Sequence, residues 1–129
     1  MVVTCRHDIP LRVYNIRGTG ERLSYAQILV KNIMDSPDCP TKVVYQIFTS
    51  LRLTVQILLY DIGCHFETYL KSRMSDEEFD RLAFAVSIFH MYGHEFKCQV
   101  RYSPRRLNGL GLTDGESCER VWAALRYQT

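Results

Sequence analysis

Three carboxylates occupy positions from which they could bind a divalent cation. Asp61 ends the apolar run of residues 55–60, while Glu116 and Glu119 lie three residues apart much later in the chain. The apolar run predicts a buried strand with Asp61 at its carboxyl end, where open α/β sheets place their chemistry. Such carboxylates suit metal-dependent phosphodiester cleavage, because Mg²⁺ binds through one or two carboxylates and shares its remaining ligands with phosphate and water. The alternative for Asp61 is an ordinary turn residue after a strand.

The two glutamates have different local roles in the helix that this region predicts, which begins near Asp114. Thr113 and Glu116 fit a capping box, in which the Glu116 side chain accepts a hydrogen bond from the backbone N–H of Thr113. Glu119, one turn deeper, has no such local role. Glu119 is therefore the preferred metal-binding partner of Asp61, and Glu116 is the alternative.

A second group of residues has the chemistry of a zinc site, and it consists of His90, His94, Cys98, Cys5 and His7. If residues 90–98 form a helix, the first three face one way and could hold Zn²⁺, with the pair near the N-terminus completing tetrahedral coordination. Against this, Gly93 lies inside the proposed helix, and there is no Cys-x-x-Cys spacing. The alternative is that these residues pack as ordinary half-buried side chains.

One segment of the chain is dense in positive charge, and it contains Lys97, Arg101, Arg105 and Arg106. Next to a metal site these residues could bind nucleic-acid phosphates, with Tyr102 available to stack on a base. The alternative is a solvated loop whose aromatic side chains turn inward.

The elements that must position these residues follow from apolar periodicity. After the strand before Asp61, the sequence predicts two short tandem helices, one over residues 65–73 and one after a capping box of Ser75 and Glu78. Residues 83–89 predict a second strand, which a loop and the acidic helix follow. This order favours an α/β fold and resembles the latter half of an RNase H-like topology.

The upstream part of the chain is less regular. Residues 1–20 predict extended chain and loop, and Ser24 predicts the N-cap of a helix that ends before Pro37. Residues 41–49 fit either a helix or a strand, because their β-branched residues follow helical spacing.

Length and composition are those of a single globular domain over residues 1–129, with 47% hydrophobic residues. A net charge of +2 is too small to identify a nucleic-acid binder, so any such contact must come from local clustering. Five cysteines without even spacing, and no signal peptide, favour a reducing compartment. The apolar runs are too short to span a membrane.

Four segments follow one another along the chain: Cys5-Arg-His-Asp-Ile-Pro-Leu11, Tyr60-Asp-Ile-Gly-Cys64, His90-Met-Tyr-Gly-His94 with Cys98, and Gly109-Leu-Gly-Leu-Thr-Asp-Gly-Glu-Ser-Cys-Glu-Arg-Val-Trp122. Together they resemble, in the right order, the conserved blocks of the Kyakuja-Dileera-Zisupton (KDZ) transposases, found largely in fungal genomes. The resemblance implies an RNase H-like core in which Asp, Asp and Glu hold two divalent cations, Mg²⁺ or Mn²⁺, for DNA strand cleavage and transfer. It also implies DNA as partner and a nuclear location.

The resemblance places the first catalytic Asp on an opening strand upstream of the block at residues 5–11, and Asp8 does not look like a residue in the middle of a central strand. We therefore expect a helix-rich, partial RNase H-like fold that lacks the first strands and is inactive alone. Another chain could supply the missing strands, since residues 55–60 would otherwise be an exposed sheet edge. The alternative is a non-catalytic, transposon-derived binding module with a structural zinc site.

Overall fold

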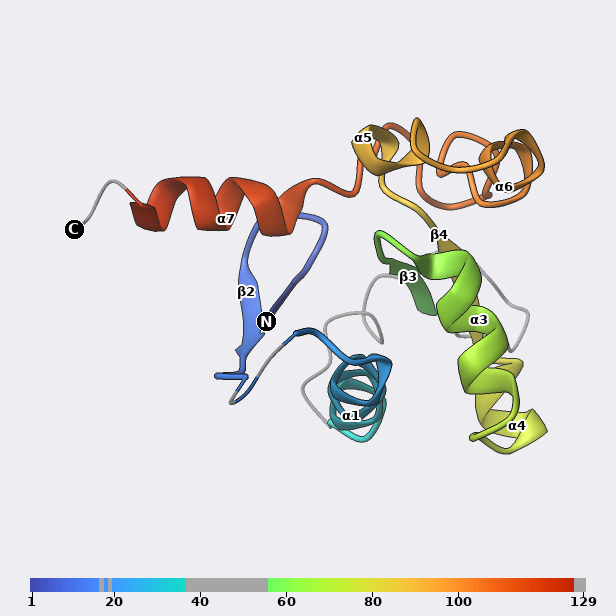
Figure 1. The fold of residues 1–129 in the computed structure, drawn as a ribbon, viewed down its shortest axis with the longest axis horizontal. Coiled ribbons are helices and arrows are strands. Elements are labelled where there is room, and N and C mark those ends of the chain that lie inside the picture. The colour runs from blue at the N-terminus through green and yellow to red at the C-terminus, as the bar shows by residue number, and fades with distance from the viewer. Residues whose placement is uncertain (17, 19, 37–55, 127–129) are drawn as a thin grey trace.

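The computed structural model describes residues 1–16, 18, 20–36 and 56–126, and within them the chain is mixed α/β (Figure 1). These residues form six helices and two separate two-stranded sheets. The element predicted as helix or strand at residues 41–49 lies outside the described residues. In the described part of the chain, no helix is long and apolar enough to cross a membrane.

A strand–helix–helix–strand unit forms the centre of the fold. Strand β3 (Gln56–Leu59) pairs in parallel with β4 (Leu82–Ala85), and α3 (Gly63–Lys71) and α4 (Asp76–Phe79) connect them. The predicted order of strand, two helices and strand is confirmed, because the apolar runs and helical spacings in this region agree with the structure. The predicted strand over residues 83–89 is too long, since the chain leaves the sheet after Ala85.

Helix α3 lies very close to β4 at its first residue. A Cβ atom added at Gly63 would lie 2.6 Å from the carbonyl oxygen of Ala85, so only glycine allows this approach. Beyond it, Phe66 and Leu70 are almost completely buried. The close approach fixes the start of α3 against the end of β4, which are the two segments that carry the site described below.

Local sequence signals predicted the start of one helix correctly and the start of another incorrectly. The capping box of Ser75 and Glu78 is confirmed, with the Ser75 side chain accepting from the Glu78 N–H and the Glu78 side chain accepting from the Ser75 N–H. The predicted N-cap at Ser24 is wrong, because α1 (Leu23–Met34) already begins at Leu23 with Arg22 as its N-cap. Helix α1 contributes Ala26, Val30 and Met34 to the core that α3 and β4 share.

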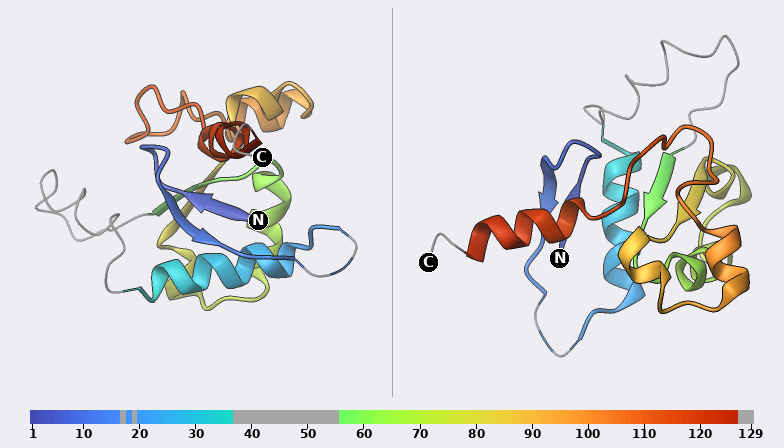
Figure 2. Two further views of the ribbon diagram at one scale, coloured as in Figure 1. Left: turned by 90° about the vertical axis from the view of Figure 1, so that its left-hand side faces the viewer. Right: turned by 90° about the horizontal axis from the view of Figure 1, so that it is seen from above.

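The N-terminal residues form an antiparallel pair, β1 (Val2–Thr4) and β2 (Pro10–Val13), where the sequence predicted only extended chain and loop. This hairpin lies beside α7 (Ser117–Arg126), and the turn between its strands lies next to that helix (Figures 1 and 2). Two further short helices, α5 (Ile88–Met91) and α6 (Phe96–Arg101), follow β4.

The structure departs from the sequence analysis at three points in the C-terminal half, the first of which is the helix on which the zinc hypothesis depended. Residues 90–98 do not form one helix, because α5 ends at Met91 and a turn through Gly93 separates it from α6. Helix α7 begins at Ser117, three residues after the predicted start at Asp114. The predicted capping box does not form, since the Thr113 N–H donates to the carbonyl of Leu110.

Candidate functional site

Asp61 lies directly after β3, and the end of β4 brings a histidine to it. Parallel strands end at the same edge of a sheet, so the segment after Ala85 approaches the segment after Leu59. The His90 Nδ1 atom lies 3.4 Å from Asp61 Oδ1 and 2.9 Å from Ser87 Oγ. Asp61 remains accessible, with 55% of its side chain exposed.

The charges of both predicted glutamates act on Asp61, although the three carboxylates do not all lie within 4.8 Å of one another; we call Asp61, Glu116 and Glu119 the carboxylate group. Burial raises the pKa of Asp61, and the negative charges of Glu119, Glu21 and Glu116 raise it further, while His90 opposes them. A nearby cation would offset this repulsion, but Asp61 and the glutamates would have to move closer together to share one divalent ion.

Glu116 is held by a long-range hydrogen bond. Its Oε1 atom accepts from the backbone N–H of Phe89 at 2.9 Å, which joins the loop before α7 to the start of α5. Glu119 is exposed in the first turn of α7. The predicted difference between the glutamates therefore remains, although the backbone group that occupies Glu116 belongs to Phe89 and not to Thr113.

The loop that precedes α7 packs tightly on the ends of β3 and β4. Gly115 has a φ of 84°, and a Cβ atom added there would lie 2.8 Å from side-chain atoms of Leu59 and Ser87. The backbone N–H of Ile88 also donates to the carbonyl of Asp114. These contacts bring the start of the acidic helix to the edge of the sheet that carries Asp61.

An arginine ties α7 to the N-terminal hairpin. The Arg120 guanidinium lies 2.8 Å from carboxylate oxygens of both Asp8 and Asp114. These bonds lower the pKa of Asp8 to about 2 and also lower the pKa of Asp114. The segment around Asp8 thus acts in this structure as an anchor for the helix that carries Glu119.

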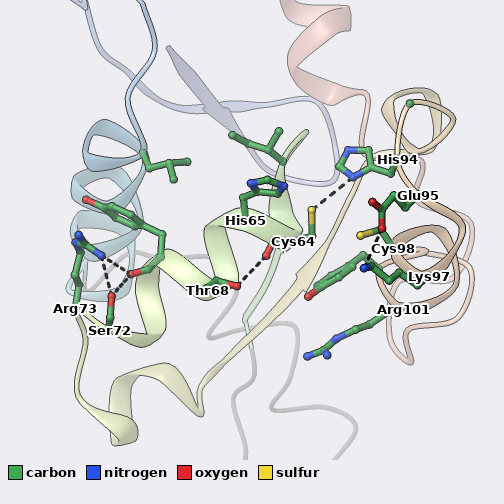
Figure 3. Close-up of a pocket in the computed structure, with 15 residues that line it drawn as sticks. Cys64, His65, Thr68, Ser72, Arg73, His94, Glu95, Lys97, Cys98 and Arg101 are labelled. Carbon is green, nitrogen blue, oxygen red and sulfur yellow. Dashed lines mark hydrogen bonds and ion pairs between the residues drawn. The ribbon is translucent and has the colours of Figure 1, made fainter.

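A second cluster, the thiol–imidazole group, consists of Cys64, His94 and Cys98, whose ligand atoms all lie within 4.8 Å of one another. Their side chains turn toward one another from the first turn of α3, the turn before α6, and α6 itself (Figure 3). The Cys64 Sγ atom lies 3.5 Å from His94 Nδ1. Burial raises the pKa of the Cys64 thiol, and the neighbouring Cys98 raises it further.

This cluster contains only two of the five predicted zinc ligands. His94 and Cys98 belong to it, whereas His90 contacts Asp61. Cys5 lies outside the cluster and has His7 beside it, with 3.9 Å between Sγ and Nδ1. The sequence analysis did not identify Cys64 as the third member of this cluster. The sequence feature that could have pointed to it is its position three residues after Asp61.

The predicted phosphate-binding residues border the thiol–imidazole group. Lys97 and Arg101 line a cleft of about 1110 Å³ together with Arg73. Lys97 is paired with Glu95 at 2.9 Å, and Arg101 with Glu67 at 3.2 Å. Arg105 and Arg106 are exposed in the following loop, where Arg105 donates to the carbonyl of Gly111 at 3.4 Å.

A family model described as Kyakuja-Dileera-Zisupton transposase matches residues 1–128. The chain belongs to the KDZ transposase family. No curated protein and no solved structure matches it. The earlier resemblance, which rested on four short segments, is thereby confirmed over nearly the whole chain.

The four segments that resemble KDZ transposase blocks are joined in two pairs by direct contacts in this structure. The first segment reaches the last through Asp8 and Arg120, and the second reaches the third through Asp61 and His90. The His94 Nε2 atom also lies 2.8 Å from the backbone carbonyl of Asp61. The pair of Asp8 and Arg120 joins residues 112 positions apart, and the contact between His94 and Asp61 joins residues 33 positions apart.

Proposed function

We propose that this chain forms part of the catalytic core of a DDE-type DNA transposase, with Asp61 and Glu119 as ligands of Mg²⁺ or Mn²⁺. The observation that carries the proposal is that the loop before α7 packs on the ends of β3 and β4, next to Asp61, in a chain of the KDZ family. The parallel pair of β3 and β4, with its connecting helices and a later acidic helix, supports a partial RNase H-like arrangement.

In this proposal each residue of the group has a distinct task. When bound, the divalent ion activates the attacking water or hydroxyl and stabilises the negative charge of the phosphodiester in the transition state. Asp61 and Glu119 bind the ion, while Glu116 positions the start of α7 through the Phe89 N–H. His90 lies against Asp61 and Ser87, which restricts the orientation of the Asp61 carboxylate.

Strand cleavage and transfer need a further carboxylate ligand, and we propose that another chain supplies it. On this basis the 129-residue chain binds the ion but has little or no nuclease activity alone. The DNA backbone would run along the basic residues of the cleft and of the loop that follows it: Lys97, Arg101, Arg105 and Arg106. Action on chromosomal DNA would place the protein in the nucleus.

Calorimetric titration with Mg²⁺ and Mn²⁺ tests the proposal, using the wild-type chain beside the double variant Asp61→Asn with Glu119→Gln. We expect binding by the wild type and its loss in the double variant. Glu77→Gln is the matched control, because Glu77 is an exposed carboxylate on α4, outside the carboxylate group. Equal binding by all three proteins would refute the proposal.

A second candidate function is a non-catalytic binding module, and the thiol–imidazole group favours it by offering a structural metal site. In that case DNA or protein binding would not depend on the carboxylates. A DNA-binding measurement with and without Mg²⁺ separates the two functions. Unchanged binding by Asp61→Asn with Glu119→Gln would support the module, whereas loss of a Mg²⁺-dependent component would exclude it.

A further inference from the structure

We propose that Cys64, His94 and Cys98 bind one Zn²⁺ ion, and that this ion positions Asp61 through the His94 imidazole. The zinc site itself does not depend on the proposed transposase function. Its effect on Asp61 does rest on that function, because Asp61 matters as a metal ligand only if the carboxylate group binds a divalent cation.

The donor set and its spacing fit zinc. Two thiols and an imidazole are soft to borderline ligands that select Zn²⁺ over Mg²⁺. Around a tetrahedral Zn²⁺ ion with bond lengths near 2.1–2.3 Å, ligand atoms are separated by about 3.5–3.8 Å. Cys64 Sγ and His94 Nδ1 are already 3.5 Å apart, and all three ligand atoms lie within 4.8 Å. Small side-chain adjustments therefore suffice to complete the geometry.

The hydrogen bond of His94 assigns the imidazole nitrogen that would bind the metal. Its Nε2 atom is 2.8 Å from the backbone carbonyl oxygen of Asp61, and a carbonyl can only accept, so Nε2 carries the proton. The neutral ring then presents the Nδ1 lone pair to the sulfur atoms of Cys64 and Cys98. Metal-binding histidines regularly donate their second ring N–H to a carbonyl or carboxylate in this way.

The fourth coordination position faces solvent. All three residues line the cleft of about 1110 Å³, so water can reach the ion from that side. Binding releases the two thiol protons to solvent, because the thiolates are the ligands. The product is a neutral unit of one Zn²⁺, two thiolates, one imidazole and one water molecule.

Zinc would connect three chain segments that otherwise meet only by packing and hydrogen bonds. Cys64 lies in the first turn of α3, Cys98 lies in α6, and His94 lies in the turn between α5 and α6. Since His94 also holds the carbonyl of Asp61, the ion fixes the backbone at the end of β3. Asp61 is therefore held at two points, its carbonyl by His94 and its carboxylate by His90.

The first test is metal content and Co²⁺ substitution on the full chain. We expect one equivalent of zinc, a Co²⁺ spectrum with thiolate-to-metal charge transfer, and at least about tenfold weaker metal binding in Cys64→Ser, Cys98→Ser and His94→Ala. Cys118→Ser and His7→Ala are matched controls that should keep wild-type binding, because both residues lie outside the cluster. Wild-type metal binding by the three cluster variants would overturn the proposal, as would a Cys64–Cys98 disulfide in the protein purified under reducing conditions.

A second measurement needs no substitution and covers the case in which a variant fails to fold. Nitrogen NMR of the His94 ring in the zinc-loaded wild type should show a protonated Nε2 and a metal-bound Nδ1. The reverse assignment, or a ring unaffected by zinc, would contradict the site.

Calorimetry with Mg²⁺ before and after zinc removal then tests the effect on Asp61, for which we expect at least about threefold weaker Mg²⁺ binding without zinc. Zinc binding without any Mg²⁺ binding would refute the proposed function and leave the zinc site intact, while equal Mg²⁺ binding with and without zinc would refute only the positioning effect.

Discussion

The carboxylate group and the thiol–imidazole group adjoin one another at residues 61–64, yet they differ in chemistry and in burial. Asp61 and Glu119 are accessible carboxylates, whose oxygen atoms suit a hydrated ion such as Mg²⁺. Cys64 is buried, and its cluster offers sulfur and nitrogen. Hard oxygen donors and soft sulfur donors therefore lie three residues apart here, because Asp61 follows a strand end and Cys64 lies in the first turn of a helix.

The two groups also differ in how the tertiary structure holds them. The carboxylate group depends on the loop at Gly115, which packs on the ends of β3 and β4, and on the ion pairs of Arg120, which join α7 to the N-terminal hairpin and to Asp114. The thiol–imidazole group is built from α3 and from the turn and helix at residues 94–98. Substitutions in α7 should thus change metal binding by the carboxylate group, whereas substitutions in α3 and α6 should change metal binding by the thiol–imidazole group.

The largest effect should come from Gly63→Ala, which disturbs the segment that both groups share. The added Cβ atom would lie 2.6 Å from the Ala85 carbonyl, and the resulting shift should lower the free energy of unfolding by about 2–3 kcal/mol. Urea denaturation measures this change, and metal titrations should show both groups weakened together. Gly93→Ala is the control, because its new Cβ would make an ordinary 3.5 Å contact with the His90 carbonyl. Comparable losses in both variants would contradict the importance of the α3–β4 approach.

The next effect separates the two glutamates. We expect Glu119→Gln to weaken Mg²⁺ binding at least about tenfold, or about 1.4 kcal/mol, while zinc binding is unchanged. Glu116→Gln should weaken it less, because the glutamine carbonyl can still accept the Phe89 N–H that holds this side chain. Calorimetry on both variants measures Mg²⁺ binding. A larger loss of Mg²⁺ affinity in Glu116→Gln than in Glu119→Gln would make Glu116, and not Glu119, the metal-binding residue.

A smaller effect is expected near the thiol–imidazole group, where Tyr102 follows directly after α6. Its hydroxyl donates to the Glu67 carboxylate, and its backbone carbonyl accepts from the Val86 N–H. Tyr102→Phe keeps the ring and the backbone bond but removes the hydroxyl, which should cost about 1 kcal/mol of unfolding free energy. Tyr92→Phe is the control, since 81% of Tyr92 is exposed. The Tyr102 variant should weaken zinc binding more than Mg²⁺ binding, and the opposite order would contradict the separation of the two groups.

The smallest effect concerns the pH dependence of the α7 anchor. Arg120 lowers the pKa of Asp8 from 3.8 to about 2, so this ion pair contributes stability above pH 3.8 and loses it as the pH falls through about 2. In chemical denaturation, Asp8→Asn should reduce the loss of stability across this range. Asn tolerates the positive φ of 62° at this position, so the backbone should be unaffected. An identical acid profile for wild type and variant would show that the ion pair does not anchor α7.

Much of the fold and part of the site could be predicted from local patterns in the sequence. Apolar runs and helical spacings predicted β3, α3, α4 and β4 in order, and the capping box at Ser75 needs only neighbouring residues. The same patterns placed Asp61 at the end of a strand. The predicted start of α7 was wrong because Thr113 and Glu116 match a local capping pattern while each bonds to another backbone group.

The sequence by itself determined the types of chemistry available, carboxylates in one set and thiols with imidazoles in another, together with the elements that carry most of them. Only the tertiary structure decided which residues meet. Glu116 and Phe89 are 27 positions apart, Cys64 and His94 are 30 apart, and His94 and Asp61 are 33 apart. No periodicity within one helix or strand encodes such pairs, because they form only when the ends of parallel strands and the helices after them pack at one edge of the sheet.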